Sequence, residues 1–214
     1  FGVEFGQVVE GAVVTWMEPT RQLQLTLPDV AVASLGLVLI GDSPIAAFDG
    51  STTGATVAGN IYDEVIEGLL AEHPWRFATK QVDLSHLEAT PEALWTDAWQ
   101  IPTDVLVVRR VTLNGSDIKY EIYGDKVYAD VNSSNTLTLN YIFRALEQDW
   151  PPHFRMAAVL KLASLFAMAV AGKPDMAREF ETQADFQLRK ARSTDSQSDT
   201  THDIPTTRFI TTRR

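Results

Sequence analysis

The chain of 214 residues contains no cysteine, and this absence excludes several kinds of protein at once. A disulfide framework, a thiolate nucleophile and a zinc ribbon all require cysteine. Long hydrophobic runs are also missing, because the longest one, from Val30 to Ile40, is interrupted by Ser34 and Gly36. Since a membrane-spanning helix needs about 20 apolar residues, no membrane partner is expected.

Basic residues are scarce in the first half of the chain. Residues 1–100 carry 14 acidic and 3 basic side chains, whereas residues 101–214 carry 14 and 15, so the net charge of −10 arises in the first half. This balance argues against general binding of duplex DNA. A solvated surface that keeps the protein soluble explains the acidic half equally well.

The usual signatures of catalysis and of cofactor binding are absent from the sequence. The four histidines are isolated from one another, and neither a phosphate-binding loop with its lysine nor a Gly-x-Ser-x-Gly motif occurs. No metal, cofactor or enzymatic activity is therefore expected. A catalytic carboxylate pair remains open, since such pairs form in space and leave no sequence pattern. The densest acidic cluster, Asp63, Glu64 and Glu67, is interpreted as the solvated face of a helix.

Apolar residues at alternating steps of three and four predict four helices, over residues 28–40, 56–73, 152–171 and 174–192. Proline stands at or near the start of three of them, where its missing N–H costs nothing. The third helix is apolar on almost every side, so it is expected to be buried by its own fold or by neighbouring subunits. Residues 49–60 are rich in Gly, Ser, Thr and Ala and are expected to form a loop that runs into the second helix.

Residues 75–145 carry the signals of short antiparallel strands. Alternating polarity is expected to begin a strand at Trp75, and Val105 to Thr112 and Leu137 to Phe143 are also strand-like. Gly124-Asp125 predicts a two-residue hairpin turn. Residues 90–104 are interpreted as an irregular connection. Four or five strands are expected.

The predicted fold is α+β: a bundle of about four helices with an inserted small antiparallel β domain. The core of the protein is expected to span residues 28–192. Residues 1–27 are interpreted as an extension with short strands, and residues 193–214 as an extended C-terminal arm.

Four motifs stand in a particular order along this core. They are Leu39-Ile40-Gly41-Asp42-Ser43-Pro44-Ile45, Pro74-Trp75-Arg76-Phe77, Asp125-Lys126-Val127-Tyr128-Ala129 and Glu147-Gln148-Asp149-Trp150-Pro151-Pro152-His153-Phe154-Arg155. In this order the chain resembles the tail tubular, or head-to-tail adaptor, proteins of short-tailed bacteriophages. The resemblance covers about residues 27–192, and the first 26 residues depart from it.

The resemblance implies a virion structural protein that is assembled in the host cytoplasm. Such proteins form a homo-oligomeric ring, usually a dodecamer. One side of the ring binds the portal protein at a capsid vertex, and the other receives the tail nozzle or tube protein. Genomic DNA passes through the lumen during ejection without sequence-specific binding, and an acidic lumen would repel its phosphates.

Three groups of residues are candidates for roles in such a ring. The small-residue third helix would permit close helix packing within or between subunits, with Ala157, Leu160, Ala163 and Ala167 as candidates. Asp63, Glu64 and Glu67 are candidates for the lumen or a subunit seam. In the arm, apolar and basic residues are expected to dock on the portal or a neighbouring subunit: Ile204, Arg208, Phe209, Ile210, Arg213 and Arg214. The alternative for the arm is a frayed terminus.

Two alternative functions remain open at this point. Trp75, Trp95 and Trp99 could stack on sugars in a glycan-binding module, or in a glycan-cleaving one with carboxylates nearby. Core packing is the commoner role of such residues. The second alternative is a capsid decoration protein, which would bind capsid faces and not the portal vertex.

Overall fold

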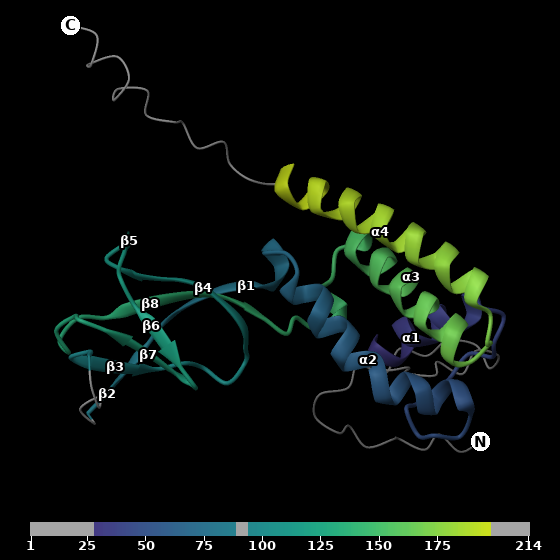
Figure 1. Cartoon of the computed structure of the whole chain (residues 1–214), viewed down its shortest axis with the longest axis horizontal. Coiled ribbons are helices and arrows are strands. Elements are labelled where there is room, and N and C mark those ends of the chain that lie inside the picture. The colour runs from purple at the N-terminus through teal and green to yellow at the C-terminus, as the bar shows by residue number, and fades with distance from the viewer. Residues whose placement is uncertain (1–27, 89–93, 198–214) are drawn as a thin grey trace, which may run out of the picture.

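The computed structural model describes residues 28–88 and 94–197, and it shows an α+β protein. Four helices form one end of the molecule and the strands form the other, with the β domain inserted between the second and third helices (Figure 1). The fold class predicted from the sequence is therefore confirmed. The N-terminal extension and most of the predicted arm lie outside the described residues.

The first two helices begin where side chains satisfy the free N–H groups of their first turns. In α1 (Pro28–Leu39), the Asp29 carboxylate accepts the N–H of Val30 at 2.8 Å, and Gly41 at φ +85° follows the helix end. In α2 (Thr53–Ala71), the Thr52 hydroxyl accepts the N–H of Ala55 at 3.0 Å. This cap starts α2 three residues before the predicted position, so part of the expected loop is helical.

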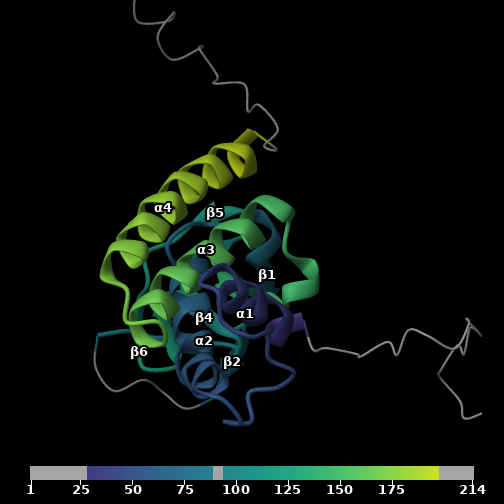
Figure 2. The same cartoon turned by 90° about the vertical axis from the view of Figure 1, so that its right-hand side faces the viewer.

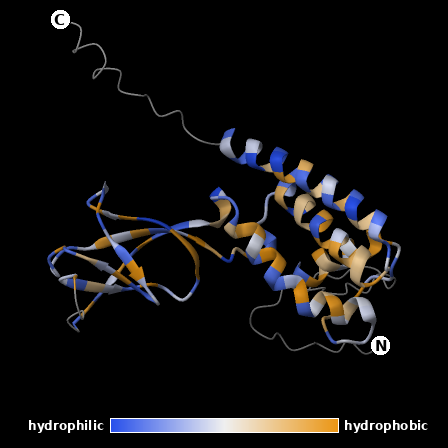
Figure 3. Ribbon diagram, viewed as in Figure 1, coloured by the Kyte–Doolittle hydropathy of each residue, from blue (hydrophilic) through white to orange (hydrophobic). Residues whose placement is uncertain are grey.

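The helix α3 (Pro152–Ala169) is the centre of the helical layer. It packs against α1, α2 and α4 (Pro174–Gln197), and the end-on view shows it between α4 and α1 (Figure 2). The hydropathy colouring shows α3 as mostly hydrophobic and α4 as mixed (Figure 3). The chain's own fold thus buries the apolar third helix.

The end of the fourth helix was predicted too early. The helix was expected to stop at residue 192 and to give way to an extended arm, but α4 continues to Gln197. Asp195 in the last turn is buried and contacts the residues that follow α2. This tertiary contact, which the local sequence does not reveal, holds the last turn in the helix.

The β domain contains eight short strands in the described residues, more than the four or five predicted. They are β1 (Thr79–Asp83), β2 (Ser85–Leu87), β3 (Asp97–Gln100), β4 (Val105–Leu113), β5 (Ser116–Asp117), β6 (Glu121–Tyr123), β7 (Lys126–Ala129) and β8 (Leu137–Phe143). They pair antiparallel in two sheets, with orders β1-β8-β4-β5 and β2-β3-β7-β6. Two local predictions were wrong: residues 97–100 form β3, and a 3-10 turn at Arg76–Ala78 precedes β1 where a strand was expected.

Each end of the molecule has its own hydrophobic core. In the helical core, the rings of Trp75 and Trp150 pack on Phe154 with centroids 4.9 and 5.0 Å apart. Trp99 belongs to the β core, and the half-buried ring of Phe143 packs against both cores. No helix within the described ranges has the length and hydropathy needed to cross a bilayer.

Candidate functional site

The residues predicted to mediate docking through the arm lie outside the described residues. These are Ile204, Arg208, Phe209, Ile210, Arg213 and Arg214. The described chain ends at Gln197, at the end of α4. Docking of the arm therefore stays a prediction.

The four packing candidates on α3 lie inside the protomer. Ala157, Ala163 and Ala167 have no exposed surface, and Leu160 is 7% exposed. A side chain that the chain's own fold covers completely has no surface left for a second subunit. The small residues of α3 thus serve close packing within one chain. Leu160 keeps a small exposed surface beside Phe186, and a role for it between subunits stays a prediction.

The acidic candidates share one exposed face of α2. Asp63, Glu64 and Glu67 are exposed, and they lie on the side of the helix opposite to the buried residues Tyr62 and Ile66. The Asp63 carboxylate lies 3.5 Å from the guanidinium of Arg144, but its side chain is 81% exposed, so this ion pair is weak. Glu64 and Glu67 have no ion-pair partner in the part of the chain that the structure describes.

The three tryptophans do not come together into a stacking platform. Trp75 and Trp99 are fully buried in different cores. The Nε1 of Trp75 donates to the carbonyl oxygen of Leu69 at 2.9 Å, so it fixes the end of α2. Trp95 is half-buried in the β domain, where its Nε1 donates to Glu121 at 3.3 Å. The core interpretation thus holds for Trp75 and Trp99.

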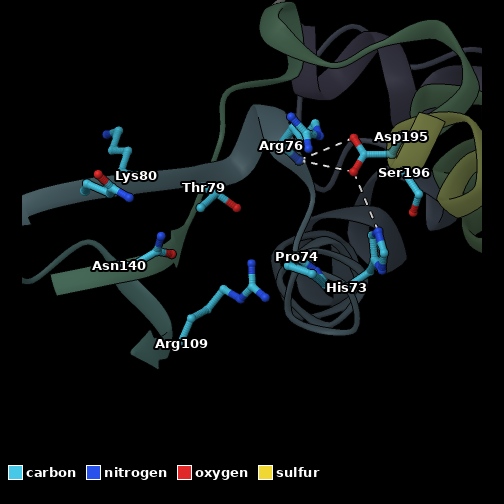
Figure 4. A pocket seen from close by; sticks show the side chains of 10 residues that line it. His73, Pro74, Arg76, Thr79, Lys80, Arg109, Asn140, Asp195 and Ser196 are labelled. Carbon is cyan, nitrogen blue, oxygen red and sulfur yellow. Dashed lines mark hydrogen bonds and ion pairs between the residues drawn. The ribbon is translucent and has the colours of Figure 1, made fainter. Parts of the chain in front are cut away.

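A cavity lies at the junction between the helical layer and the β domain (Figure 4). It has a volume of about 580 Å³. Its lining comes from the connection between α2 and β1, from β1, β4 and β8, and from the last turn of α4: His73, Pro74, Arg76, Thr79, Lys80, Gln81, Arg109, Asn140, Asp195 and Ser196. Four separate segments of the chain therefore build this one cavity: residues 73–81, Arg109, Asn140 and residues 195–196.

Asp195 organises one wall of the cavity. Both of its carboxylate oxygens accept the backbone N–H of Arg76 at 3.3 Å, and one lies 3.6 Å from Nε2 of His73. Burial lowers the pKa of His73, while the neighbouring Asp195 carboxylate opposes that shift in part. At neutral pH the histidine is therefore uncharged, and the carboxylate holds α4 against the connection between α2 and β1.

The other wall of the cavity is basic. Arg109 on β4 makes no hydrogen bond or ion pair with the described residues, and its guanidinium points into the cavity towards Thr79 and Pro74 (Figure 4). Lys80 lies at the rim, with its ammonium 3.4 Å from Asp104 and over the ring of Phe143. The buried Oδ1 of Asn140 has no hydrogen-bond partner within the described ranges. The cavity thus presents one cation that has no partner among the described residues.

No protein-family model and no curated protein matches this sequence. Within residues 28–88 and 94–197, no group of three or more His, Cys, Asp or Glu side chains is placed to hold a metal ion. The family resemblance therefore rests on the quoted motifs and their order.

The surface of α1 carries an apolar stripe. Leu35, Val38 and Leu39, which are spaced three and four residues apart, are 52%, 50% and 44% exposed. Phe186 on α4 is 59% exposed beside Leu160. Sequence reasoning found the helices but neither this stripe nor the basic cavity. The periodicity marks apolar residues without saying which side of α1 the rest of the chain covers.

Proposed function

We propose that this protein is a ring-forming head-to-tail adaptor of a bacteriophage particle, which joins the portal to the tail and lets genomic DNA pass. The observation that carries the proposal is the position of the four quoted motifs. Three of them fall at boundaries between elements of a helix–helix–β–helix–helix fold and the third forms strand β7, in the order that the resemblance requires.

Three of the motifs have a structural role at an element boundary. The first contains Gly41, whose positive φ ends α1, and the second contains Trp75, whose indole caps a carbonyl at the end of α2. The third motif includes β7, after the turn in which Gly124 has φ +61°. In the fourth, Nε1 of Trp150 donates to the carbonyl oxygen of Ala145 at 3.1 Å directly before α3. The first, second and fourth motifs therefore stabilise the end of α1, the end of α2 and the start of α3.

The exposed apolar stripe on α1 supports self-association. Leu35, Val38 and Leu39 form one continuous stripe on a helix, and a contiguous apolar surface often marks an interface. Burial of this stripe between copies would stabilise the assembly by roughly 25 cal/mol per Å² of apolar surface removed from water. The exposed acidic face of α2 is suited to a lumen, because carboxylates repel DNA phosphates and let the duplex slide.

Sedimentation velocity of the purified full chain tests this proposal, over a series of concentrations and with or without its portal protein. The expected result is a closed ring, twelve copies in size, which forms alone at high concentration or on the portal. A monomer at every concentration in both conditions would contradict the proposal.

A further inference from the structure

The basic cavity has a charge opposite to that of the protein as a whole. The chain has 28 acidic and 18 basic side chains, yet the cavity is lined by three cationic side chains, Arg76, Lys80 and Arg109, and one carboxylate, Asp195. Asp195 already accepts the N–H of Arg76 and contacts His73, and Lys80 contacts Asp104. Arg109 is the cation whose guanidinium makes no hydrogen bond or ion pair with a described residue.

An unpaired guanidinium in a cavity is suited to a carboxylate. Its planar set of N–H donors matches the two oxygens of a carboxylate, and the resulting bonds are stronger than those between neutral groups. The cavity, at about 580 Å³, has room for more than one side chain.

The same chain also has exposed carboxylates that could pair with the guanidinium of Arg109. Glu64 and Glu67 are exposed, have no ion-pair partner within the described residues, and stand three residues apart on α2. Side chains at this spacing lie on one helix face with Cβ atoms about 5–6 Å apart. The two carboxylates can therefore enter one cavity together.

The acidic face and the cavity are separate surfaces of the same chain. The cavity lining contains no residue of α2: it begins at His73 and Pro74, which follow the C-terminal end of that helix, and the last turn of α4 lies beside them. Glu64 and Glu67 face away from the buried residues Tyr62 and Ile66. A contact between two different surfaces of identical chains is head-to-tail, and repetition of such a contact closes a ring or extends a filament.

We infer that the cavity around Arg109 receives Glu64 and Glu67 of a second copy of this chain. This inference rests on the proposed ring, and it assigns the two charged surfaces that join neighbouring subunits. The acids that looked like a solvated face then lie in a subunit seam, with the guanidinium of Arg109 between their carboxylates.

A charge swap tests the inference. Arg109→Glu, and Glu64→Arg with Glu67→Arg, should each raise the concentration for half-assembly at least about tenfold, because like charges then meet at the seam. A chain that carries all three substitutions should recover most of the loss, since every seam again pairs opposite charges. Sedimentation velocity at low and high salt measures assembly, and circular dichroism reports whether each variant is folded.

The matched controls are Arg110→Glu and Asp117→Arg. Arg110 is the next residue on β4, is exposed and does not line the cavity, and Asp117 is exposed on β5. Both controls should assemble like the natural chain. If Arg109→Glu forms rings as well as the natural chain does, the inference is overturned while the adaptor proposal still stands. The same conclusion follows if the triple variant assembles less well than both Arg109→Glu and the Glu64→Arg, Glu67→Arg double variant. Charge-swap recovery in a species that is not a ring would support the inference and contradict the adaptor proposal.

Discussion

Replacement of Asp195 by alanine should loosen the junction between α4 and the rest of the protein. The carboxylate is buried and accepts one N–H, that of Arg76, through two oxygens at 3.3 Å. A hydrogen bond to a charged group contributes about 1.5–3 kcal/mol, and the length of these contacts favours the lower part of that range. We therefore expect a loss of about 2 kcal/mol, which lowers Tm by roughly 4–8 °C in a domain of this size.

Thermal unfolding followed by circular dichroism measures this loss. Asp195→Asn keeps an oxygen for the Arg76 N–H and should lose about half as much, since only the charge is removed. Asp185→Ala, at an exposed position of the same helix, should change the free energy of unfolding by less than about 0.5 kcal/mol. Equal stability of Asp195→Ala and Asp185→Ala would refute the view that this carboxylate anchors the helix end.

Four further predictions concern the backbone, the pH dependence of stability and the surface. Gly68→Ala should raise stability by about 0.5–1 kcal/mol in urea unfolding, because its new Cβ meets nothing within 4 Å. Gly36→Ala should lower stability, because its Cβ would lie 3.1 Å from the buried ring of Phe166. Because the pKa of His73 lies below 6.5 in the folded protein, Tm should fall as pH drops through 6.5, and less steeply in His73→Gln. Leu35→Lys with Val38→Lys should keep Tm but weaken self-association in sedimentation velocity, since exposed apolar surface is lost.

For three of these predictions a specific result would contradict the reasoning. A stabilised Gly36→Ala would mean that α1 and α3 can move apart at no cost. An unchanged pH profile in His73→Gln would show that another group controls that range. Assembly that is insensitive to the lysine pair would place the subunit contact away from the stripe on α1.

Much of the fold can be predicted from local patterns in the sequence. The three-and-four spacing in α2 and the apolar content of α3 located both helices, and Gly124-Asp125 located the hairpin of β6 and β7. These features depend on periodicity and on turn residues, which neighbouring positions determine. The start of α2 was missed because the Thr52 cap lies inside a segment that reads as a loop.

The candidate sites depend on contacts between segments that are distant in the sequence, and local sequence patterns do not predict such contacts. The Asp195 carboxylate accepts the N–H of Arg76, which is 119 residues away in the sequence. The residues around position 193 therefore give no sign that α4 continues. The cavity joins residues from β1, β4 and β8 with the last turn of α4 and the connection that follows α2. The small residues of α3 indicated close packing correctly, but only the fold shows that the partner is the same chain.

The most direct test of the account is negative-stain electron microscopy of the full chain mixed with its portal protein. The account predicts closed rings of high symmetry, stacked on one face of the portal and open along the shared axis. Portal particles without added density, beside a protein that remains monomeric, would contradict the adaptor function.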